Sequence, residues 1–117
     1  MPTLRELTEA IQKHSGVEAV VIVGADGLLI ETHDTAQNYA EAIAARVPGL
    51  ATAAGLLGDA ATRGNATMAV LEFDRGYGVV LRLSDQALLF VSAGTDVALA
   101  ELLFDLRQHR SSMAALV

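Results

Sequence analysis

Histidines are the residues of this 117-residue chain best suited to metal binding or proton transfer. The three are His14, His33 and His109, and none of them stands in the His-x-x-x-His spacing that places two ligands on one face of a helix. The chain has no Cys, which removes thiol nucleophiles, disulfides and thiolate metal sites together. We therefore expect no metal site, and His109 is interpreted as a favourable partner for a helix C-terminus.

Other catalytic patterns are also missing from the sequence. Asp26, Asp74 and Asp85 each lie in a predicted turn, where an Asp side chain has a structural role. Gly76-Tyr77-Gly78 precedes a predicted strand, so it cannot present a helix N-terminus to a phosphate. No Gly-x-Ser-x-Gly elbow is present. These patterns favour a protein that is not an enzyme and needs no cofactor.

Composition narrows the class of protein further. Hydrophobic residues make up 52% of the chain but aromatic residues only 4%, so the core must consist of Val, Leu, Ile and Ala. A net charge of −6 without any basic run argues against a nucleic-acid partner. The length suits one domain, 1–117, and the charged N-terminus does not resemble a signal peptide, so we expect a cytoplasmic protein.

The elements that must position any site are three predicted helices and five predicted strands. Capping patterns mark the helix starts, and the first two caps are followed three residues later by Glu. The candidate caps are Thr3, Asn38, and Thr95 or Asp96. The predicted strands are Val17 to Val23, Leu28 to Thr32, Thr67 to Phe73, Tyr77 to Leu83, and Ala87 to Ala93.

The order is helix-strand-strand-helix-strand-strand-strand-helix, which predicts an α+β fold. The first and last predicted strands are almost continuously apolar, so both should be central strands that helices cover on both faces. We expect an α/β/α sandwich with a five-stranded antiparallel sheet. The middle helix would cover one face and the two terminal helices the other.

The middle helix is unusual because almost half of the residues from Asn38 to Arg63 are Ala or Gly. Such a helix lets another backbone come close, which suits a helical partner, but a helix packed tightly on its own sheet explains the pattern as well. Pro48-Gly49 predicts a kink or a short break. The apolar run from Val47 to Ala61 is shorter than the ~20 residues needed to cross a bilayer, so we expect no membrane span.

The strand Thr67 to Phe73 begins the last group of three and should lie at a sheet edge. It carries no Pro or Lys to protect that edge, only Glu72. An unprotected apolar edge beside a small-residue helix favours self-association.

The order of elements and three segments resemble the roadblock/dynein light chain family. The segments are Gly16 to Val23, Asp26-Gly27-Leu28-Leu29-Ile30, and Leu88-Leu89-Phe90-Val91. The resemblance implies a homo- or heterodimer in which the third strands pair into one continuous sheet and the second helices pack together. The dimer-interface residues expected on this basis are Ala53, Leu57, Ala60, Thr67, Met68, Ala69, Val70, Leu71 and Phe73.

The resemblance also implies a function, because several bacterial and archaeal relatives act with Ras-like small GTPases as activating or exchange-type regulators. We therefore expect a non-enzymatic homodimeric regulator or scaffold of a Ras-like small GTPase. The partner-binding residues would be Arg46, Leu50, Ala54 and Arg63, with Arg46 and Arg63 on the helix and none singled out as an arginine finger. The alternatives are a light-chain-like adaptor that leaves nucleotide turnover unchanged and a small-molecule-sensing sandwich. Against the latter, the aliphatic core lacks convergent polar groups.

Overall fold

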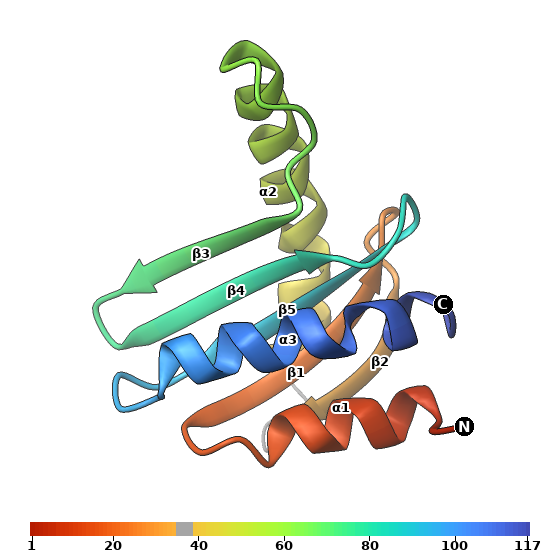
Figure 1. The fold of residues 1–117 in the computed structure, drawn as a ribbon, viewed down its shortest axis with the longest axis vertical. Helices are drawn as coiled ribbons and strands as arrows, with labels where there is room; N and C mark the ends of the chain where they lie inside the picture. The colour runs from red at the N-terminus through yellow and green to blue at the C-terminus, as the bar shows by residue number, and fades with distance from the viewer. Residues whose placement is uncertain (35–38) are drawn as a thin grey trace.

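The computed structural model describes residues 1–34 and 39–117, and within them helices cover both faces of one antiparallel sheet (Figure 1). The predicted α+β class and the predicted order of elements are confirmed. The elements are α1 (Leu4–Gln12), β1 (Val17–Gly24), β2 (Leu29–Asp34), α2 (Ala40–Ala60), β3 (Met68–Phe73), β4 (Gly76–Arg82), β5 (Ala87–Ala93) and α3 (Leu99–Ala114).

The five strands are arranged in the order β2-β1-β5-β4-β3, and every neighbouring pair is antiparallel. The nearly continuous apolar strands β1 and β5 lie next to each other in the interior of the sheet, as their sequences predict. The two remaining edges belong to β2 and β3. The prediction that β3 is an edge strand is therefore confirmed.

The sheet separates two apolar layers. On one face, Leu102 and Leu106 of α3 are fully buried and α1 packs beside α3. On the other face, Ala44 and Val47 of α2 pack against a smaller cluster of strand residues. Figure 1 shows α1 and α3 in front of the sheet and α2 behind it. Near the C-terminus Met113 is fully buried, so this end of α3 is part of the domain's own core.

The helix starts agree only in part with the predicted caps. At α1 the capping box is present, because the Glu6 N–H donates to Thr3 Oγ1 at 3.1 Å and the Thr3 N–H donates to Glu6 Oε1 at 3.2 Å. The Asn38 cap lies outside the described residues. At α3 the prediction of Thr95 or Asp96 is wrong, because both residues lie in a turn that the Val97 N–H closes on the Gly94 carbonyl at 3.3 Å. The helix begins later, after Ala98, which makes no side-chain cap.

The predicted break at Pro48-Gly49 does not occur, since α2 is one helix from Ala40 to Ala60. Proline removes one helical hydrogen bond but leaves the side-chain spacing intact. Val47 before Pro48 and Leu50 after it pack against the same cluster under the helix. Tertiary packing on both sides of the proline therefore keeps the helix continuous.

Candidate interaction surface

Helix α2 has buried residues in its first half only, and Leu50 and Ala51 add half-buried contacts to the sheet. Its buried residues are Ala40, Ala44 and Val47, at the spacing of four and three that marks one helical face. From Leu50 onwards none of its residues is buried, and the second half projects past the sheet at the β3 edge (Figure 1). Because the rest of the domain does not cover this apolar half of the helix, it suits a protein interface.

The exposed side of this projecting half carries three of the expected dimer residues. Ala53, Leu57 and Ala60 follow one another at spacings of four and three, so they form one stripe, called here the outer stripe of α2. All three are exposed, and Leu57 is 70% exposed. Leu56 next to it is 66% exposed and was missed by the sequence analysis. The sequence carries a signal for an exposed leucine here. Leu56 and Leu57 are adjacent, and on a helix of 3.6 residues per turn two adjacent side chains cannot both face the sheet.

The four residues expected to bind a partner do not form one cluster. Arg46 is exposed and stands seven residues before Ala53, so it extends the outer stripe of α2. Leu50 and Ala54 instead line a groove between α2 and the sheet. Arg63 lies beyond the end of α2 rather than on it, where its N–H donates to the Gly58 carbonyl at 2.8 Å.

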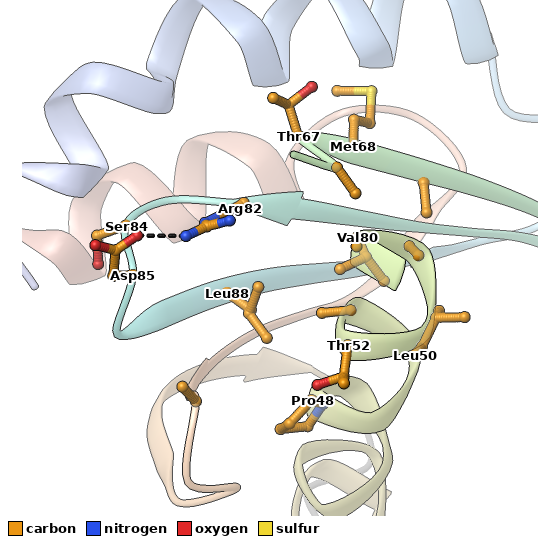
Figure 2. Close-up of a pocket in the computed structure, with 16 residues that line it drawn as sticks. Pro48, Leu50, Thr52, Thr67, Met68, Val80, Arg82, Ser84, Asp85 and Leu88 are labelled. Carbon is orange, nitrogen blue, oxygen red and sulfur yellow. Dashed lines mark hydrogen bonds and ion pairs between the residues drawn. The ribbon is translucent and has the colours of Figure 1, made fainter. Parts of the chain in front are cut away.

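The groove is a cavity of about 270 Å³ between the middle of α2 and strands β3, β4 and β5 (Figure 2). Its walls are mostly aliphatic, with Leu50 from the helix and Val80 and Leu88 from the sheet. At one end an ion pair joins Arg82 to Asp85. Because that pair is already satisfied, the groove offers little to hold a polar ligand.

Strand β3 forms the second part of the surface. Its side chains alternate between the two faces of the sheet. Met68 packs toward the core under α3, and its Sδ lies 3.8 Å from Arg107 Nη2. Ala69 packs toward the cluster under α2. Of the remaining expected residues, Leu71 is half-buried, and Thr67, Val70 and Phe73 are exposed.

The exposed end of β3 is shaped by a glycine on its neighbour. A Cβ atom on Gly78 of β4 would come within 3.0 Å of Phe73 Cε2 and within 2.9 Å of Phe90 Cε1. Glycine therefore makes room for both rings on the face that α2 partly covers. Phe73 remains 55% exposed, so it adds apolar surface next to the edge.

Metal-binding side chains do not gather in the described part of the chain. Within residues 1–34 and 39–117, no three His, Asp or Glu side chains are placed to hold a metal ion. His14, in the connection between α1 and β1, instead pairs with α3, with its Nε2 3.3 Å from Asp105 Oδ2.

By length and composition alone, α2 could also cross a membrane. Its first half, however, is packed on the sheet through Ala44 and Val47. The part of α2 beyond these contacts, from Thr52 to Ala60, is far shorter than the ~20 residues that a bilayer requires. That the protein has no membrane span stays a prediction.

The fold is therefore an antiparallel sandwich with β3 at one sheet edge and the apolar helix α2 projecting past that edge. The chain belongs to the Roadblock/LC7 domain family, whose model matches residues 3–93. The resemblance seen in the sequence is thus confirmed. Domains of this family are generally non-catalytic regulators.

Solved structures share the fold over nearly the whole chain. A Roadblock/LC7 domain from Streptomyces avermitilis superposes with a TM-score of 0.87 at 22% identity, covering 97% of both chains. MglB of Myxococcus xanthus gives 0.88 at 15% identity, covering 97% of this chain and 93% of that one. MglB in a tetrameric arrangement gives 0.88 at 14% identity, covering 97% and 86%. No curated protein sequence matches the chain.

Proposed function

We propose that this protein is a homodimeric, non-catalytic regulator or scaffold of a Ras-like small GTPase in the cytoplasm. The observation that carries the proposal is the exposed surface of two parts of the chain, the outer stripe of α2 and the free edge of β3. A domain of this size that exposes Leu56 and Leu57 on α2 and Phe73 on β3 has apolar surface that association would cover.

The geometry favours a second copy of the chain as the first partner. A two-fold axis beside β3 would join two sheets and place both α2 helices on the same face of the combined sheet. The small side chains Ala53 and Ala60 would then allow the two helices to approach closely, with Leu57 packing between them. One contact would cover both the open edge and the projecting helix.

The dimer would present the remaining surface of both α2 helices to the GTPase. Arg46 is exposed at the end of the outer stripe nearest the sheet. A charged group there lies at the rim of the apolar dimer contact and can contact the GTPase. Support for a GTPase comes from the family resemblance and from the fold shared with MglB. The regulator would act by reshaping the catalytic loops of the GTPase, since no Arg of this chain stands out as a supplied finger.

The test uses a Ras-like small GTPase from the same organism, preloaded with GTP. We expect the protein to bind it and to produce a saturable change in single-turnover hydrolysis or in release of a fluorescent GDP analogue. The variant Arg46→Ala should weaken this effect while remaining a dimer. Arg75→Ala, which alters an exposed Arg in the β3–β4 turn, is the matched control.

The outcomes separate the candidate functions. Binding without any change in hydrolysis or release would favour the light-chain-like adaptor. Absence of binding to every Ras-like GTPase of the organism would overturn the GTPase proposal. A small-molecule sensor would instead be stabilised by a metabolite in a thermal-shift screen, with the ligand in the groove between α2 and the sheet.

A further inference from the structure

We propose that two copies pair their β3 strands in one defined register, with Val70 opposite Val70 of the partner subunit and Glu72 of each copy paired with Arg107 of the other. This inference rests on the proposed homodimer. It adds what the dimer alone does not specify, namely which residues meet and which charged pair selects a second copy of this chain.

The direction of the backbone groups along β3 limits the possible registers. The Arg82 N–H donates to the Thr67 carbonyl at 3.0 Å, so position 67 directs its backbone groups toward β4. In an antiparallel ladder the direction alternates from one residue to the next. The backbone N–H and C=O groups of Met68, Val70 and Glu72 therefore point to the free edge, where no strand of the described residues pairs with them.

Two-fold pairing must match these outward groups with their own copies. When the axis passes beside Val70, Val70 faces itself, Met68 faces the partner's Glu72, and Glu72 faces the partner's Met68. All the outward groups of β3 are then bonded. If the axis instead passes beside Ala69, only Met68 and Val70 find partners in the other β3 strand. If it passes beside Leu71, only Val70 and Glu72 do. The Val70-centred register thus satisfies the most backbone groups, which is the strongest requirement at a buried strand edge.

The same register brings opposite charges together. Side chains of directly opposed residues have Cβ atoms about 4.5–5.5 Å apart on the same face of the sheet. Glu72 would therefore lie beside Met68 of the partner subunit, and within each copy Met68 Sδ is 3.8 Å from Arg107 Nη2. The Glu72 carboxylate would reach the guanidinium of Arg107 of the partner subunit. Both side chains are exposed in the single chain and free to turn toward each other.

This pair gives the edge a means of selecting its partner. Two-fold symmetry produces the Glu72–Arg107 contact twice, and neither copy opposes a like charge at these positions. A register slip by two residues would place Glu72 opposite Ala66 or Val70 of the partner subunit, and the Glu72–Arg107 contact would be lost. Exposed ion pairs contribute modestly to affinity, but wrong charge combinations are disfavoured, so the pair serves mainly specificity.

The first test reads the register by single cysteines, because the natural chain has none. Val70→Cys should form a disulfide-linked dimer under mild oxidation, since directly opposed Cα atoms about 5.5 Å apart fall within disulfide reach. Ala69→Cys and Leu71→Cys are the controls. In the proposed register each of them meets its own copy only diagonally, at about 7–8 Å, and should link slowly.

The second test exchanges charges across the contact. Glu72→Arg and Arg107→Glu should each weaken the homodimer about tenfold, because like charges then meet twice. An equimolar mixture of the two variants restores both opposite-charge contacts and should recover nearly the wild-type dissociation constant. Glu101→Arg, an equal charge change at an exposed α3 position, should leave the dimer unchanged. Circular dichroism of each variant checks that it is folded.

Failure of this inference can be told from failure of the homodimer. A wild-type protein that is monomeric by light scattering would overturn both. A wild-type dimer in which Ala69→Cys or Leu71→Cys links faster than Val70→Cys would overturn the register alone. A wild-type dimer whose charge-exchanged mixture is no tighter than the separate variants would overturn the Glu72–Arg107 pair.

Discussion

Gly58 and Gly64 lie so close together that a Cβ atom at position 58 would overlap the carbonyl oxygen of Gly64. The chain leaving α2 folds back along the helix at this point, and the Arg63 N–H closes the turn on the Gly58 carbonyl. The approach fixes the direction in which the chain leaves the projecting helix to begin β3. A glycine in the last turn of a helix is thereby required by packing, although it lowers helix propensity.

Replacing Gly58 should therefore destabilise the fold. Gly58→Ala forces the return segment away from the helix, and we expect a loss of about 2 kcal/mol, as for other overpacked sites. Gly55→Ala is the matched control, because a Cβ at position 55 meets no atom within 4 Å. The control should gain about 0.5–1 kcal/mol from helix propensity. Urea unfolding at one fixed protein concentration measures both, and equal effects of the two variants would contradict the packing explanation.

Thr62 carries backbone strain at the end of α2. Its φ of 58° lies in the left-handed region, which a β-branched residue seldom adopts. Thr62→Gly should raise the free energy of unfolding by about 1 kcal/mol. Thr62→Ala keeps a Cβ in the same conformation and should give little of that gain. A thermal melt that ranks the alanine variant above the glycine variant would show that the strain is not the controlling term.

The sequence was sufficient for the order of elements and for the sheet edge, because these depend on local periodicity and on turn residues. Thr3 and Glu6 are adjacent to the helix they cap, so their spacing alone identifies the box. Thr95 and Asp96 show the limit of that reasoning, since a cap-forming residue also forms turns. The helix α3 begins at Leu99, which packs against the core, and no side chain caps its start.

The residue types of the candidate surface were predictable from the sequence, but which side chains of α2 are exposed was not. The sequence shows that α2 is rich in small residues, and it cannot show that only the first half has buried residues. Which of Leu50, Leu56 and Leu57 is uncovered depends on where the helix leaves the sheet edge. For the same reason Arg46 and Leu50, only four residues apart, have different surroundings.

Pro48 should cost stability without interrupting α2. It lies inside the helix, where its nitrogen cannot donate to the carbonyl four residues earlier. Pro48→Ala should restore that bond and raise the free energy of unfolding by about 1–3 kcal/mol. Pro2→Ala, at the exposed N-terminus, is the control and should have no effect. If Pro48→Ala lowers the melting temperature, packing of the proline ring in the groove outweighs the missing hydrogen bond.

Leu57 should matter for association and not for folding. It is 70% exposed on the outer stripe of α2, so Leu57→Glu removes no packing within the chain. In the proposed dimer the new carboxylates would be buried at the contact of the two helices, where unpaired charge is strongly disfavoured. Light scattering should show the wild type near twice 12.2 kDa and the variant near 12.2 kDa, with unchanged circular dichroism. Leu28→Glu changes an equally exposed leucine, 68% exposed, beside the opposite edge strand and should remain dimeric. If both variants keep the wild-type mass, the outer stripe of α2 is not the dimer contact, and the association must be sought at β3 alone.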